Sequence, residues 1–226
     1  MLSVYGKREW MASLAMGVML GGTLLGVGLW WLALPVFALT AAVLSFFRDP
    51  ERRVPTQRGV VVSPADGRIT SIHKVDHYEP FGAPAICIRV FLSVFNVHIN
   101  RCPCHARIES VEHRPGDHLS ALNPRGVEAN ESNLIVMVHP THHHHVAAVR
   151  QVAGQFARTI VCAAMPERIY QRGQRLGMIK LGSTTELYLP ATLEPKIEVE
   201  VDQQVRAGLT IMAMLQKRAS DGSGAH

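Results

Sequence analysis

The sequence has few aromatic residues, few cysteines and no dense run of basic residues. Of its 226 residues, 6% are aromatic and 18% are charged, and the net charge is +5. Because this charge is mild and dispersed, nucleic acid is not expected as a partner. Four cysteines, at 87, 102, 104 and 162, are too few for a disulfide scaffold and lack zinc-site spacing. We expect reduced thiols and no metal; the alternative is a metal clip at residues 102–105.

Charged residues are absent from one long stretch. Residues 10–47 contain no Asp, Glu, Lys, Arg or His. A helix that spans a bilayer needs about 20 apolar residues, so this stretch is long for one span and short for two. We therefore expect residues 1–50 to be a helical membrane anchor, either a hairpin that bends at Pro35 or a single span, with a re-entrant arrangement left open. The apolar segment is too long for a cleaved signal peptide.

The residues that flank and interrupt this stretch suggest its arrangement. Lys7 and Arg8 precede it and Arg48 follows it. By the positive-inside rule, both ends of a hairpin then face the cytoplasm, which places the following domain on the cytoplasmic side of the cell (inner) membrane. Glycines at 17, 21, 22 and 26 have the spacing that lets two helices pack closely.

The rest of the chain has the pattern of a β-rich domain. Short apolar, β-branched segments alternate with turn residues, and SPADG at 63–67 contains an Asp-Gly turn signal. We expect a mainly β (α+β) fold, with this domain at residues 51–218 and a flexible tail at 219–226. The expected strands are at 60–62, 68–73, 85–95, 133–139, 146–152, 159–164, 196–201 and 209–215, and a short helix is expected at 167–174.

The segment GMIKLGST at 177–184 admits two interpretations. Gly182-Ser183 is either a loop between two strands or a site of self-cleavage. A serine hydroxyl can attack the carbonyl of the residue before it, and a glycine at that position leaves the carbonyl unhindered. The resulting ester can undergo β-elimination, which cuts the chain and leaves dehydroalanine. Hydrolysis would then turn Ser183 into a pyruvoyl group, a carbonyl cofactor made from the chain itself.

Several segments together resemble the phosphatidylserine decarboxylase proenzymes of the compact bacterial and archaeal type. The similar segments are FFRDP at 46–50, SPADG at 63–67, FLSVFNVHINR at 91–101 with Pro103, NE at 130–131, and GMIKLGST at 177–184. The resemblance implies cleavage between Gly182 and Ser183 into a β chain (1–182) and an α chain (183–226), which stay associated as a heterodimer. Ser183 then carries the pyruvoyl group, and no metal is required. Further oligomerisation is left open.

The resemblance also implies a reaction. The pyruvoyl ketone at Ser183 forms a Schiff base with the amine of phosphatidylserine and accepts the electrons released as CO₂ leaves. Protonation and hydrolysis then release phosphatidylethanolamine. A general acid is needed, and histidine is the usual residue for this task.

Other site residues are assigned from the same motifs. His98 occupies the histidine of the family's strand motif and is the expected proton carrier; a packed strand histidine is the alternative. Where longer members have a second histidine, credited as the base for self-cleavage, this chain has Arg101, so that base is left open. Asp66 is expected to orient a histidine, or only to form the turn. Asn130 and Glu131 are expected to shape the site.

Two further groups of residues attract attention. The four histidines from His142 to His145 are expected to form a solvated turn rather than a metal site, because alternate strand residues face opposite ways. Arg101, Arg107 and Lys180 are candidates to meet a lipid phosphate.

Two other functions remain open at this point. A pyruvoyl enzyme that acts on a soluble amino acid fits the cleavage motif, but the apolar stretch argues against it. A membrane-tethered, non-enzymatic β domain that binds lipid or protein fits the composition. Borohydride trapping with substrate separates the enzymes from the binding domain.

Overall fold

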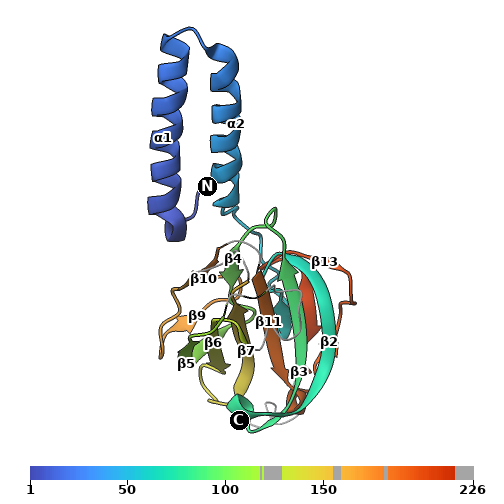
Figure 1. Ribbon diagram of the computed structural model, residues 1–226. Coiled ribbons are helices and arrows are strands. Elements are labelled where there is room, and N and C mark those ends of the chain that lie inside the picture. Colours follow the sequence, from blue (N-terminus) through green and yellow to red (C-terminus); the bar gives the residue numbers. More distant parts are fainter. Residues whose placement is uncertain (118, 120–128, 155–158, 181–182, 217–226) are drawn as a thin grey trace. The chain divides into compact units, whose positions relative to one another are not determined.

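The computed structural model describes residues 1–117, 119, 129–154, 159–180 and 183–216. The chain divides into two compact units, residues 1–51 and residues 52–226 (Figure 1). The expected tail at 219–226 lies outside the described residues. The prediction of a mainly β fold with a helical N-terminus is confirmed.

The first unit is a helical hairpin. A short 3-10 helix, Val4–Gly6, leads into α1 (Lys7–Gly26), and α2 (Trp30–Phe46) returns beside it. The chain reverses at Gly28, whose φ of +78° is readily adopted by glycine. The expected bend at Pro35 is wrong, because Pro35 lies inside α2 and Gly28 makes the reversal.

Two of the four spaced glycines pack the hairpin. A Cβ added to Gly17 would lie 2.1 Å from Oγ1 of Thr40, and one added to Gly21 would lie 2.5 Å from the Phe37 ring. Gly22 and Gly26 have open space around them. In the described part of the chain, no helix has the length and apolar character needed to cross a membrane.

The second unit is built from antiparallel strands. Its strands are β1 (Val60–Val62), β2 (Gly67–Tyr78), β3 (Ala83–Leu92), β4 (Ile99–Arg101), β5 (Ala106–Arg114), β6 (Ser132–Val138), β7 (His145–Val152), β8 (Ile160–Cys162), β9 (Ile169–Tyr170), β10 (Arg175–Ile179), β11 (Ser183–Pro190), β12 (Lys196–Ile197), β13 (Gln204–Val205) and β14 (Ile211–Met214). Two 3-10 helices, Glu79–Phe81 and Ala191–Leu193, connect strands.

The described strands form one large sheet and two small ones. The large sheet has the order β13-β2-β3-β11-β7-β6-β5-β9, and the small sheets have the orders β1-β14-β12 and β4-β10-β8. The main core contains residues from all three sheets, such as Leu187 of β11, Leu176 of β10 and Met212 of β14. Strand alternation therefore sends Leu187 and Leu189 into this core and Glu186 and Tyr188 to the other face.

The expected helix at 167–174 is wrong. Glu167 and Gly173 have φ values of 66° and 78°, which end any right-handed helix there. Between them β9 pairs with β5, and the buried Tyr170 hydroxyl donates to the Ala163 carbonyl at 2.9 Å. Tertiary contacts of Tyr170 thus take precedence over the weak helical pattern. The expected strand at 85–95 ends instead at Leu92, where a turn begins.

Candidate active site

Ser183 is the first residue of β11 in the centre of the large sheet. It pairs with Leu92, the last residue of β3, and its side chain is completely buried. Its hydroxyl has no hydrogen-bond partner among the residues that the structure describes. Gly182, the other half of the predicted cleavage site, lies outside the described residues. The interpretation of Ser183 as a loop residue is corrected, since it lies in a strand.

His98 lies next to the segment that precedes Ser183. Its carbonyl accepts a hydrogen bond from the Ile179 N–H at 3.2 Å, beside the Ile99–Met178 pair of β4 and β10. The chain from Leu92 to His98 therefore borders both ends of the segment from Ile179 to Ser183. The structure thus brings His98 and Ser183, which are far apart in sequence, to the same end of the fold.

The hydrogen bond of the His98 ring assigns its tautomer. Nδ1 lies 2.9 Å from the carbonyl oxygen of Asn96. A carbonyl only accepts hydrogen bonds, so Nδ1 carries the proton, and in the neutral ring Nε2 carries the lone pair. His98 is fully buried. This arrangement suits a residue that accepts and returns a proton at Nε2.

Asp66 holds the loop before β2. Its Oδ1 accepts from the Ala207 N–H and its Oδ2 pairs with Arg52, both at 2.8 Å, and both side chains of the ion pair are nearly buried. These contacts do not pair Asp66 with His98. The same loop is bonded to β4, the strand that follows His98, because the Pro64 carbonyl accepts a hydrogen bond from the Arg101 N–H at 2.9 Å.

A chain of buried polar side chains lies on the face of β11 that carries Ser183. Thr185 is two residues from Ser183 and therefore points to the same side. Its Oγ1 accepts from Nδ2 of Asn100 at 3.0 Å, and Oδ1 of Asn100 accepts from Nε2 of Gln151 at 2.8 Å. Oε1 of Gln151 accepts from Nδ2 of Asn133 at 3.1 Å. These four residues are at most 3% exposed.

Sequence reasoning missed this polar chain, although one of its members lies inside a family motif and another directly follows one. Asn100 follows His98 by two residues, and Thr185 follows Ser183 by two. Period-two alternation would have placed Thr185 beside Ser183. Gln151 and Asn133 lie in strands that read as ordinary apolar segments, and only the pairing of β6, β7 and β11 brings them to the site.

Asn130 connects the NE motif to the site. Its Nδ2 donates to the carbonyls of Ala153 and Leu119, both at 2.8 Å, and its Oδ1 accepts from the Leu119 N–H. Ala153 packs in turn against Ile179, just before the cleavage segment. Glu131 lies farther out, with its carboxylate 3.8 Å from Nε2 of His113.

The basic residues proposed to meet phosphate have other contacts. Arg101 is 6% exposed and donates from Nη1 to the Gly173 carbonyl at 3.0 Å. Arg107 pairs with Glu167 and lies 2.8 Å from Nδ1 of His143. Lys180 is half-buried beside the site.

The histidine-rich segment forms the expected turn before β7, although His145 itself begins the strand. The rings of His139, His142 and His144 lie close together, with centroids 4.8 to 6.3 Å apart. In the described residues, no group of three His, Cys, Asp or Glu side chains is arranged to hold a metal ion. The four cysteines are free thiols, and burial raises the pKa of Cys102 and of Cys104.

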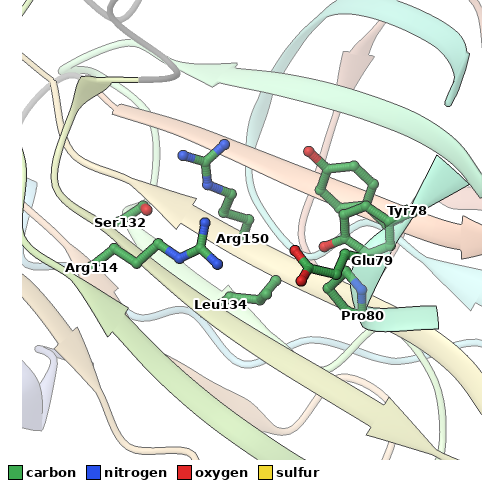
Figure 2. Close-up of a pocket in the computed structure, with 8 residues that line it drawn as sticks. Tyr78, Glu79, Pro80, Arg114, Ser132, Leu134 and Arg150 are labelled. Carbon is green, nitrogen blue, oxygen red and sulfur yellow. The ribbon is translucent and has the colours of Figure 1, made fainter. Parts of the chain in front are cut away.

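A separate hollow of about 350 Å³ lies on the opposite face of the large sheet (Figure 2). Tyr188, five residues from Ser183, lines it, so it opens on the face away from the Ser183 side chain. In Figure 2 the guanidinium of Arg114 and the carboxylate of Glu79 point toward one another. Beside this hollow, the buried Glu186 carboxylate accepts hydrogen bonds from Arg89 and from the Tyr188 hydroxyl.

The chain is similar to known proteins over most of its length. A family model described as phosphatidylserine decarboxylase matches residues 39–213. A phosphatidylserine decarboxylase proenzyme from Rhodopirellula baltica is 43% identical over 83% of this chain and 78% of its own length. The proenzyme from Carboxydothermus hydrogenoformans is 38% identical over 95% of this chain and 98% of its own length. The chain therefore belongs to the phosphatidylserine decarboxylase family.

Proposed function

We propose that this chain decarboxylates phosphatidylserine to phosphatidylethanolamine after cutting itself between Gly182 and Ser183. One observation carries the proposal: the Ser183 hydroxyl is fully buried and has no hydrogen-bond partner in the described structure. A buried polar group without a partner calls for an explanation, and a nucleophile held ready beside its target is one. The names of the relatives, which are proenzymes, support processing into two chains.

The proposed self-cleavage needs no reagent other than water. The Oγ of Ser183 adds to the Gly182 carbonyl carbon, and the Ser183 nitrogen leaves with a proton to give an ester. Loss of the Ser183 Cα proton then breaks the Cβ–Oγ bond, which frees the Gly182 carboxylate and leaves dehydroalanine. Water hydrolyses the tautomeric imine, releases ammonia and leaves a pyruvoyl group at residue 183. The products are the β chain 1–182 and the α chain 183–226, which stay together as a heterodimer.

His98 is the proposed proton carrier. Because the Asn96 carbonyl holds Nδ1–H, Nε2 is the ring nitrogen that we propose takes a proton and later returns it. Asp66 acts as a positioning residue in this proposal. Its bonds to Arg52 and Ala207 hold the loop whose Pro64 carbonyl binds β4, the strand that follows His98.

The surroundings of Ser183 fit the cofactor derived from it. The pyruvoyl carbonyl, once formed, would bind the substrate amine and supply the electron sink for loss of CO₂. Thr185 lies on the same face of β11 as Ser183 and is held there by the Asn100 amide, so that its hydroxyl can orient a polar group of the substrate. Complete burial of Ser183 keeps bulk water away, which strengthens these interactions.

The proposed substrate is a membrane lipid, so we place the helical unit at the cell (inner) membrane with the catalytic domain on the cytoplasmic side. Large apolar side chains on both helices support this placement, since Met19, Trp30 and Leu39 are each more than 60% exposed. Lys7 and Arg48 put positive charge at both ends of the hairpin, which favours the cytoplasmic side.

The proposal is tested by measuring the masses of the purified chain and its Ser183→Ala variant, and the CO₂ each releases from phosphatidylserine. The parent should give two fragments, the smaller beginning with a pyruvoyl group at residue 183, and Ser183→Ala should be uncut and inactive. Ser132→Ala is the matched control, because Ser132 is a 2% exposed serine of β6 that lines the hollow on the opposite face. An active parent that remains uncut, or an active Ser183→Ala variant, would sink the proposal.

A further inference from the structure

The connection between β3 and β4 is a closed turn rather than a loose loop. The Asn96 N–H donates to the Ser93 carbonyl at 3.0 Å, which defines a four-residue turn. Oδ1 of Asn96 also accepts from the Ser93 N–H at 2.9 Å and from the Ser93 hydroxyl at 2.8 Å. Val94 and Phe95 therefore occupy the two central positions of a turn whose ends are bonded together.

These two residues are unusual for a turn tip. Central turn positions favour Gly, Pro, Asn, Asp and Ser, which supply the required dihedral angles or tolerate water. Here Val94 is 42% exposed and Phe95 is 83% exposed. The other large apolar residues exposed in the described part of the catalytic unit are between 44% and 53% exposed and are not adjacent in sequence; Ile169, at 52%, is one of them.

The tip is directly linked to the candidate active site. Leu92, the residue before the turn, pairs with Ser183, and the Asn96 carbonyl at its end holds Nδ1 of His98. In Figure 1 the connection between β3 and β4 projects beyond the ends of these strands. One four-residue turn thus presents two apolar side chains outward and positions the proposed proton carrier inward.

We propose that the Val94–Phe95 tip contacts the phospholipid bilayer and brings phosphatidylserine to the site. This inference rests on the proposed function, because it takes the substrate to be a lipid. An apolar ring at a membrane surface is buried at the boundary between the headgroups and the acyl chains, which lies next to the serine carboxylate to be removed. Residues 92–97 carry no charge, so the tip can enter this layer without desolvating an ion. The short, closed turn then couples the depth of the tip to the position of His98.

The inference is tested with two forms of the substrate. Phe95→Ser and the control Ile169→Ser are assayed on phosphatidylserine in phosphatidylcholine vesicles and on a short-chain phosphatidylserine kept below its micelle concentration. Ile169 is the matched control because it is also an exposed apolar residue, but it lies on the edge strand β9. Complete self-cleavage of each variant is checked first by mass. Burying one phenyl ring predicts that Phe95→Ser lowers the vesicle-to-monomer ratio of kcat/KM by about tenfold or more.

Each outcome decides the question. Ile169→Ser should keep the parental ratio, and Phe95→Trp should restore it, because tryptophan also settles at the interface. An equal loss on both substrates would mean that Phe95 is structural and would overturn the inference. An unchanged ratio would also overturn it and would leave a protein partner as the occupant of the tip. If the fully cleaved parent converts neither substrate, the proposed function fails instead.

Discussion

A substitution of Gln151 interrupts the buried chain of polar side chains on the Ser183 face of β11 at its middle. Gln151 accepts from Asn133 at 3.1 Å and donates to Asn100 at 2.8 Å, and all three residues are almost completely buried. Methionine has a similar length and volume but neither donates nor accepts strongly. Gln151→Met therefore leaves a buried donor on Asn133 and a buried acceptor on Asn100 while changing the packing little.

The expected magnitude follows from the number of groups left without partners. Each buried polar group in that state costs about 1–3 kcal/mol, so Gln151→Met should lower the free energy of unfolding by about 2–6 kcal/mol. Asn100→Leu also leaves two such groups, on Gln151 and Thr185. The double variant again leaves only two, on Asn133 and Thr185. Its loss should therefore resemble that of one single variant rather than their sum.

The free energy of unfolding is measured by urea titration of the full chain in detergent micelles, with circular dichroism as the signal. All variants carry Ser183→Ala, so that every chain stays uncut and the comparison is like for like. Gln204→Met is the control, since Gln204 is exposed on β13. It should remain within about 0.5 kcal/mol of the parent.

Two results would refute the reasoning. If the losses of the two single variants add within about 0.5 kcal/mol in the double variant, the amides act independently and do not form a chain. If Gln151→Met is no more destabilising than Gln204→Met, the Gln151 amide contributes nothing to the fold. Either result would also remove the amide chain from the account of how the Thr185 hydroxyl is held beside Ser183.

Two further predictions concern charge and pH. Asp66→Asn keeps an acceptor for the Ala207 N–H but removes the charge that faces the nearly buried Arg52, so it should lower the free energy of unfolding by about 3 kcal/mol. Adding Arg52→Met to the same chain should recover much of this loss, because no buried charge is then left without its partner. If nothing is recovered in urea titrations, the ion pair does not stabilise the fold. Burial, and then the Glu186 carboxylate, raise the pKa of Cys87 from 9.0 to about 12. As the pH rises, the Cys87 thiol ionises at a lower pH in the unfolded chain than in the folded one. The stability that Cys87 contributes is therefore complete below about pH 9 and is lost as the pH rises toward 12. The free energy of unfolding should fall by at most about 1.4 kcal/mol per pH unit in this range. In urea titrations between about pH 9 and 11, Cys87→Ala should lose stability less steeply than the parent, and equal slopes would disprove the shift.

Secondary structure was predictable where local pattern and burial agree. The apolar β-branched segment at 60–62 is the strand β1, and those at 133–139 and 146–152 coincide with β6 and β7 to within a residue at each end. The strand β5 was not predicted, because its second half is charged and exposed. The helix expected at 167–174 failed because the burial of Tyr170 and the left-handed Glu167 override a short periodic pattern.

By itself, the sequence predicted the chemistry that involves consecutive residues. The proposed attack by Ser183 on Gly182 joins two consecutive residues, so motif reading was enough to propose the cleavage and the family. The hydrogen-bond partners of the buried polar side chains could not be predicted in this way, because they lie far apart in the sequence. Only the tertiary structure showed that Asp66 binds Arg52 and Ala207 and that Thr185 continues into a buried chain of amides. The register of β11 between β3 and β7 decides the last of these contacts, because it sets which side chains share the face of Ser183.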